Sequence, residues 1–162
     1  MGNDNPYFTP GTQMMHRYHL TTQSSDETRE LAQKIAAQLK PGDVLAMIGD
    51  LASGKTTFTQ GITTYFDILE YALSPTFTYI NEYHASNQDI IHIDAYRLNS
   101  GKDLISMGIW DYYDSGAIVI IEWADIVAEA IPSDAIGFNF KHAKNDNNGR
   151  EILIDSPRVL DL

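Results

Sequence analysis

The chain contains no cysteine, and this absence excludes several kinds of chemistry. A disulfide scaffold, a thiolate metal site and a cysteine nucleophile all require a residue that is missing. Long apolar runs are also missing, since every hydrophobic segment is far shorter than the roughly 20 residues that span a bilayer. The N-terminus shows no basic segment followed by an apolar stretch of signal-peptide length. The sequence therefore predicts a cytoplasmic protein that does not associate with a membrane.

Basic residues are scarce as well. Eleven lysines and arginines face 22 aspartates and glutamates, which gives a formal net charge of −11. The basic residues are scattered along the chain and form no run or stripe that could follow a phosphate backbone. We therefore expect no direct binding of DNA, and contact with RNA only through other proteins.

A phosphate-binding loop is the most informative feature that is present. Residues 49–57 read GDLASGKTT and match G-x-x-x-x-G-K-[ST] at every required position. An apolar run at 44–48 precedes this loop and a helix-compatible segment follows it, as the motif requires. In such a loop, backbone N–H groups surround the phosphates, Lys55 reaches the β- and γ-phosphates, and the Thr56 hydroxyl binds Mg²⁺. The sequence thus predicts a site for a magnesium nucleotide.

The length and composition fit one α/β domain. With 162 residues, 43% of them hydrophobic, the chain is long enough to bury a real core. We expect residues 1–14 to be a flexible leader and residues 15–162 to form a three-layer P-loop NTPase-like fold with a mostly parallel central sheet. Expected strands are 16–20, 43–48, 76–83, 90–93, 117–121 and a C-terminal hairpin of 136–142 with 151–155; expected helices are 25–39, 55–66, 104–113 and 125–131.

Two acidic residues stand at strand ends, where open α/β sheets bind their ligands. The run 90–94 ends in Asp94 and the run 118–122 ends in Glu122. Either carboxylate could bind the metal beside the loop, and either could instead cap the following helix. The polar segment 74–76 (Ser-Pro-Thr) lies between the loop helix and the next strand, where related NTPases place a switch residue, so Thr76 is the switch candidate.

Further residues have two interpretations. Trp123, next to Glu122, could form a wall of the nucleotide pocket or belong to the core at a strand end. His84 and His92 have no third ligand at suitable spacing, so a histidine metal site is not expected. Tyr71, Tyr79, Tyr83 and Tyr96 suit half-buried sheet or interface positions.

Beyond the loop, the order and spacing of several segments resemble the TsaE (YjeE) family. These segments are 49–57, SPTFT at 74–78, NEY at 81–83, HIDAYRL at 92–98 and IEW at 121–123. The resemblance implies a small ATPase required for N6-threonylcarbamoyladenosine at tRNA position 37. It also implies two partners, TsaD and TsaB, whose complex the ATPase resets between turnovers while TsaD transfers the threonylcarbamoyl group.

The resemblance also implies roles for individual residues. Thr56 and Glu122 correspond to the Mg²⁺ ligands, Asp94 to an essential acidic residue near the γ-phosphate, and Thr76 to a switch threonine. Ser25 falls where the family contacts the nucleotide base. The phosphate cradle corresponds to Ala52, Ser53, Gly54, Lys55, Thr56 and Thr57.

The sequence departs from the family pattern within the loop. The common family loop reads GDLGAGKTT, whereas Ala52 and Ser53 replace glycine and alanine here. If position 52 requires a positive φ, alanine costs about 1 kcal/mol there. Ala95 replaces a usual leucine, and Ala124 a frequent proline or serine, without touching a catalytic group.

Three other classes of function compete with this one. A P-loop kinase would need several cations for donor and acceptor phosphates, yet Arg97 is the only arginine between Arg29 and Arg150. A GTPase would carry an Asn/Thr-Lys-x-Asp motif, and none occurs. A nucleotide-dependent binding module without turnover is the third alternative, because no arginine finger is evident.

Overall fold

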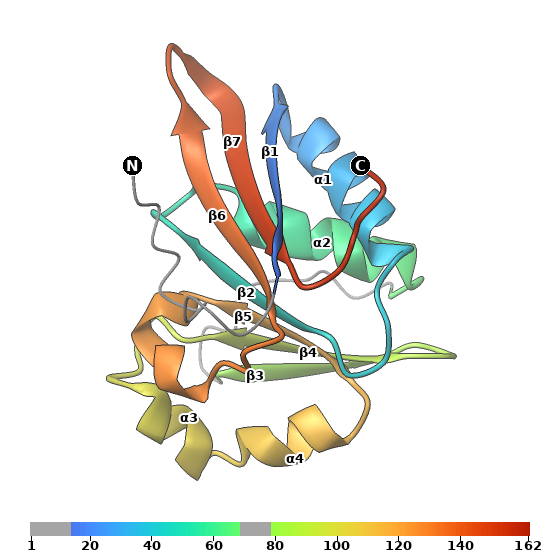
Figure 1. Ribbon diagram of the computed structural model, residues 1–162, viewed down its shortest axis with the longest axis vertical. Coiled ribbons are helices and arrows are strands. Elements are labelled where there is room, and N and C mark those ends of the chain that lie inside the picture. Colours follow the sequence, from blue (N-terminus) through green and yellow to red (C-terminus); the bar gives the residue numbers. More distant parts are fainter. Residues whose placement is uncertain (1–13, 69–78) are drawn as a thin grey trace.

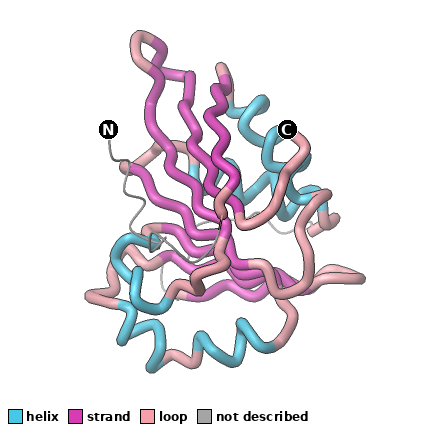
Figure 2. The backbone as a smooth tube through the Cα atoms, viewed as in Figure 1, coloured by secondary structure: helices cyan, strands magenta, loops and turns pink. Residues whose placement is uncertain are grey.

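The computed structural model describes residues 14–68 and 79–162. Within them lies a seven-stranded sheet in the order β1-β7-β6-β2-β5-β4-β3 (Figures 1 and 2). The strands are β1 (His16–Thr22), β2 (Val44–Gly49), β3 (Ile80–His84), β4 (Asp89–Asp94), β5 (Ile118–Glu122), β6 (Ile136–Ala143) and β7 (Asp146–Ser156).

Helices cover both faces of the central strands (Figure 1). α1 (Ser25–Ala36) and α2 (Lys55–Tyr65) lie on one face. α3 (Gly101–Ser106), α4 (Ile109–Asp114) and the 3₁₀ helix η1 (Ala124–Ala130) pack on the other. The three-layer α/β prediction is confirmed.

The expectation of a mostly parallel sheet is only half right. β2 pairs in parallel with β5 and β6, and β4 pairs in parallel with β5. The other three pairings, β1–β7, β6–β7 and β3–β4, are antiparallel. Short connections allow only antiparallel pairing, so the predicted C-terminal hairpin and the tight β3–β4 link give the sheet antiparallel edges.

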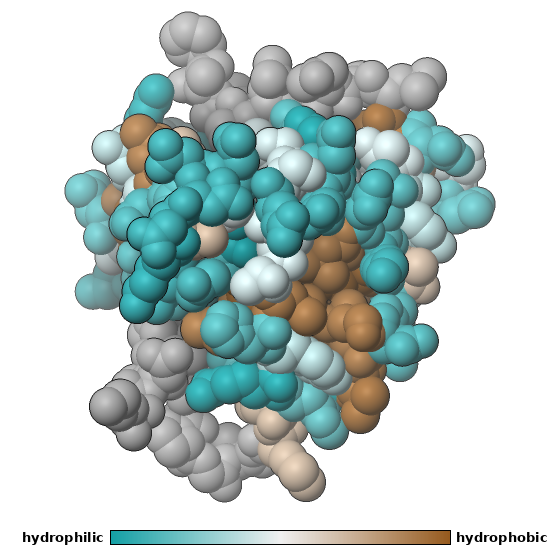
Figure 3. Space-filling model, turned by 90° about the horizontal axis from the view of Figure 1, so that it is seen from above, coloured by the Kyte–Doolittle hydropathy of each residue, from teal (hydrophilic) through white to brown (hydrophobic). Residues whose placement is uncertain are grey.

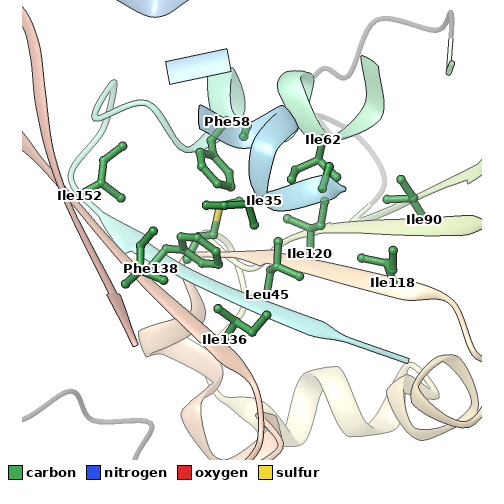
Figure 4. Close-up of a cluster of buried hydrophobic side chains, with 14 of the residues drawn as sticks. Ile35, Leu45, Phe58, Ile62, Ile90, Ile118, Ile120, Ile136, Phe138 and Ile152 are labelled. Carbon is green, nitrogen blue, oxygen red and sulfur yellow. The ribbon is translucent and has the colours of Figure 1, made fainter. Parts of the chain in front are cut away.

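Alternating side chains divide the core between the two faces of the sheet. On β2, Leu45 and Met47 point toward α1 and α2, whereas Val44 and Ala46 belong to the cluster under α3 and η1. Figure 4 shows Phe58 and Ile62 of α2 above the sheet residues. β5 is buried along its whole length, as its apolar run predicts for a strand covered on both faces.

Several boundaries differ from those expected. The helix expected over 104–113 is two short helices, because Gly108 adopts a left-handed φ of 85° and starts a new one. The hairpin turns at residues 144–145, where Asn145 has φ 68°, so its strands are longer than predicted. β3 starts at Ile80. Residues 76–78, the first part of the strand expected over 76–83, lie outside the described residues. Ser24 is the N-cap of α1, accepting a hydrogen bond from the Glu27 backbone N–H.

None of the helices formed by residues 14–68 and 79–162 combines the length and hydrophobicity of a membrane span. The molecular face in Figure 3 is mostly hydrophilic, with a larger hydrophobic area right of its centre and smaller ones toward its upper edge. A largely polar face with some exposed apolar surface is ordinary for a folded domain.

Candidate nucleotide site

A pocket opens where β2, β4 and β5 end. These neighbouring strands run in parallel, so their carboxyl ends meet at one edge of the sheet, where such sheets bind ligands. The pocket brings together the loop and the two strand-end carboxylates. Its lining residues are Leu51, Ala52, Ser53, Gly54, Lys55, Thr56, Thr57, Asp94, Tyr96, Glu122, Trp123 and Arg150.

The loop has the backbone that its glycines allow. Gly49, at the end of β2, has φ 151°, and a Cβ there would lie 2.6 Å from the Phe140 carbonyl oxygen. Gly54 has φ 110° and precedes the first residue of α2. Ala52 also adopts a left-handed φ, of 60°, which glycine would occupy without strain. Position 52 therefore has a positive φ, where alanine costs about 1 kcal/mol.

Lys55 is buried and held by the loop itself. Its Nζ donates to the carbonyl oxygens of Gly49 at 2.5 Å and Asp50 at 2.9 Å. Burial lowers the pKa of Lys55, while the nearby carboxylates of Glu122 and Asp94 act in the opposite direction. Carbonyl oxygens are neutral partners for an ammonium group, so a nucleotide phosphate would be a stronger acceptor in their place.

Thr56 and Glu122 lie together beside Lys55. The Thr56 Oγ1 donates to both carboxylate oxygens of Glu122, at 3.1 and 3.3 Å. Glu122 is only 2% exposed, and its Oε1 also lies 3.1 Å from His92 Nε2. A hydroxyl and a carboxylate are the hard oxygen donors that Mg²⁺ prefers.

The donor set fits a metal shared with a nucleotide. In the described part of the chain, no group of three or more His, Cys, Asp or Glu residues could hold a metal ion. Mg²⁺ is usually bound by one or two protein groups together with phosphates and water. Thr56 and Glu122 fit that arrangement.

Asp94 stands on the neighbouring strand, in register with Glu122. Its Oδ1 accepts a hydrogen bond from the Tyr96 backbone N–H at 3.0 Å. Partial burial raises the pKa of Asp94, and the negative charge of Glu122 raises it further. The contact with Thr56 distinguishes the two carboxylates, because the Thr56 hydroxyl donates to Glu122 and not to Asp94.

Trp123 lies inside the pocket as well as against the core. The Lys55 Nζ sits 4.3 Å from the centre of the Trp123 ring, close enough for a cation–π contact. Tyr96, which is 59% exposed, packs on Trp123 with ring centres 4.9 Å apart. Trp123 has a left-handed φ of 57°, uncommon for a bulky residue and frequent at functional sites.

Comparison with known proteins decides the family. A family model described as "Threonylcarbamoyl adenosine biosynthesis protein TsaE" matches residues 22–152. The chain belongs to the TsaE family. The proteins of this family act in the biosynthesis of threonylcarbamoyladenosine in tRNA, so the resemblance found in the sequence is confirmed.

Individual TsaE relatives agree with the family model. The "tRNA threonylcarbamoyladenosine biosynthesis protein TsaE" of Bacillus subtilis is 37% identical over 81% of this chain and 80% of the relative. The protein of the same name from Rickettsia conorii is 37% identical over 80% of this chain and 73% of its own. The crystal structure of Bacillus subtilis YdiB superposes with a TM-score of 0.76 and 31% identity, covering 91% and 90% of the two chains.

The expected roles of two further residues, Ser25 and Thr76, stay predictions. Ser25 is exposed at the start of α1 and is not among the lining residues, so its contact with the base stays a prediction. Thr76 lies outside the described residues, and its switch role likewise stays a prediction.

Three residues at or beside the pocket were not marked as site residues by their sequence patterns: Arg150, Tyr96 and His92. Arg150 and Tyr96 line the pocket, and His92 contacts Glu122 from the buried part of β4. Arg150 follows an asparagine-rich turn and lies in no motif, so only the fold brings it near the loop. His92 could have been found from its spacing, because it lies two residues before Asp94 on the same strand.

Adding ATP with Mg²⁺ should change the fluorescence of Trp123. The ring lies beside Lys55, so an ammonium group that turns toward a phosphate alters its surroundings. Trp123→Phe should remove the signal, while Trp110→Phe, a matched change at a 47% exposed position on α4, should keep it. A titration that shows the full signal in the Trp123→Phe chain would assign the change to Trp110 instead.

Proposed function

We propose that this TsaE-family chain binds and hydrolyses ATP with Mg²⁺ and thereby resets a TsaD–TsaB complex between rounds of tRNA modification. One observation supports this proposal most strongly. A lysine, a hydroxyl and two carboxylates, which are Lys55, Thr56, Asp94 and Glu122, meet in one pocket at the carboxyl ends of parallel strands. These are the groups that phosphoryl transfer on a P-loop uses.

Each residue has a separate task in the proposal. Lys55 leaves the carbonyl oxygens of Gly49 and Asp50 and binds the β- and γ-phosphates. Thr56 and Glu122 hold Mg²⁺, which when bound neutralises charge on the phosphates. Asp94, at the end of β4, orients or deprotonates the water molecule that attacks the γ-phosphate. Ala52 to Thr57 supply backbone N–H groups to the phosphates.

The pocket has few cations of its own. Lys55 and Arg150 are its only basic residues within the described part of the chain, and four carboxylates act on Lys55 from nearby. A site so poor in positive charge offers little stabilisation to a transition state with charge on the γ-phosphate. The chain alone should therefore hydrolyse ATP slowly, and a partner should supply what is missing. Contact with tRNA would be made through that partner, because the net charge of −11 opposes direct binding.

The TsaD–TsaB complex should accelerate ATP hydrolysis by this chain. We expect a stimulation on the order of tenfold or more, since one added transition-state cation can contribute that much. The complex should also bind this chain more tightly with ATP than with ADP, because only ATP brings a γ-phosphate to Lys55 and Asp94. The ATPase rate and the yield of a pull-down, measured across a partner titration, test both effects.

Two results would oppose the proposal. If the rate stays at its isolated value and the nucleotide does not affect association, the ATPase-subunit role fails. A small-molecule or nucleotide kinase would then be the better account. In that case labelled γ-phosphate from ATP would appear on an acceptor molecule instead of as inorganic phosphate.

A further inference from the structure

Arg150, within the long strand β7, reaches across to the phosphate-binding loop. Its Nη2 donates to the carbonyl oxygen of Ala52 at 3.2 Å, across a separation of 98 residues. The side chain passes over Gly54, with its Cγ, Nε and Cδ 3.7 to 3.8 Å from where a Cβ of that glycine would stand. The β6–β7 hairpin and the loop are thus joined by one side chain.

The other end of the guanidinium group is fixed to the hairpin. Nη1 donates to the carbonyl oxygens of Asn147 at 3.0 Å and Gly149 at 2.8 Å. No salt bridge ties Arg150 to a carboxylate of residues 14–68 or 79–162. The planar, rigid group therefore connects two backbone segments and can hold them at a set distance.

Ala52 is the position in the loop where such support has an effect. Alanine at φ 60° is in a conformation that glycine adopts readily and that other residues avoid. A hydrogen bond from a charged donor to the Ala52 carbonyl fixes the peptide that joins Ala52 to Ser53. A bond that holds this carbonyl in place opposes relaxation of Ala52 out of the left-handed region, which would move the backbone N–H groups of the loop.

We infer that Arg150 is a positioning residue that holds the Ala52 peptide in its left-handed conformation and so keeps the loop ready for a nucleotide. This inference rests on the proposed nucleotide binding. It explains how the loop functions with alanine where the common family loop has glycine. The support comes from a hairpin far away in sequence.

A double-mutant cycle with Ala52→Gly tests the inference. In the otherwise unchanged chain, Arg150→Met should weaken ATP binding about tenfold, equivalent to about 1.4 kcal/mol. In the Ala52→Gly background the same change should weaken binding only about twofold, because glycine needs no help to reach a positive φ. Isothermal titration with ATP and Mg²⁺ gives all four affinities without requiring turnover.

Arg17→Met is the matched control, since Arg17 pairs with Asp155 on β1 and β7 and does not line the pocket. It should leave ATP affinity unchanged. Thermal melts without nucleotide should show that Arg150→Met remains folded, which separates positioning of the loop from general stability.

Three results would overturn the inference. An equal loss in both backgrounds would mean that Arg150 contacts the nucleotide directly, for which its buried Nε–H, without an acceptor among the described residues, is a ready donor. No loss in either background would mean that the contact with Ala52 has no role. If the unchanged chain itself fails to bind ATP, the proposed function fails first, and the inference with it.

Discussion

Lys55→Ala is expected to weaken ATP binding by a factor on the order of 10 to 100 and to reduce hydrolysis with it. Lys55 is the only lysine lining the pocket in the described part of the chain. Its Nζ contacts only neutral groups there, which are two carbonyl oxygens, the Ser53 hydroxyl and the Trp123 ring. A charge-assisted hydrogen bond contributes about 1.5 to 3 kcal/mol, which corresponds to this range of affinity. Isothermal titration with ATP and Mg²⁺ measures it.

A matched control comes from α3. Lys102 is exposed and does not line the pocket, so Lys102→Ala removes the same charge without touching the site. Its ATP affinity should equal that of the unchanged chain, and thermal melts should show both variants folded. If Lys55→Ala keeps both its affinity and its turnover, the loop does not bind the nucleotide phosphates.

The second large effect separates the two carboxylates. Glu122→Ala should raise the Mg²⁺ concentration needed for half-maximal ATP hydrolysis by about tenfold, because the loss of a ligand carboxylate weakens metal binding. Asp94→Ala should instead lower the turnover number with little change in metal dependence, because Asp94 has no contact with Thr56 of the kind that Glu122 makes. Steady-state rates over a Mg²⁺ titration at saturating ATP distinguish the two.

Thr56 offers an internal control for this assignment. Thr56→Ser keeps the hydroxyl that donates to Glu122. Thr56→Val keeps the branched shape of the side chain but removes the hydroxyl. Only the valine variant should reproduce the metal dependence of Glu122→Ala. A shift of metal dependence in Asp94→Ala alone would exchange the roles assigned to the two carboxylates.

The parts of the site that lie close together in sequence were predictable. The loop is one contiguous motif, and its glycines and lysine report directly on the backbone and charge that a phosphate needs. Asp94 and Glu122 were found because each ends an apolar run, and parallel strands bring such ends to one edge. Their positions at strand ends left their roles open, and the family resemblance assigned them. In the structure the Thr56 hydroxyl donates to Glu122, which agrees with that assignment.

Contacts between distant segments were not predictable. Arg150 lies 98 residues from Ala52 in a strand whose sequence says nothing of the loop, and the pairing that brings it there depends on the order of the whole sheet. The antiparallel pairing of β1 was missed for the same reason, since β1 pairs with the last strand of the chain. Gly108 was read as a helical residue because its neighbours have helical spacing, yet its left-handed φ interrupts the helix.

Reconstitution of tRNA modification over several turnovers tests the central claim most directly. TsaD and TsaB, with tRNA and a supply of the threonylcarbamoyl donor, are assayed alone, with this chain, and with its Lys55→Ala variant. We predict that modified tRNA accumulates well beyond one equivalent per TsaD only with the unchanged chain and ATP. If modified tRNA accumulates equally with the Lys55→Ala variant, or without this chain, ATP hydrolysis by this protein does not reset the complex.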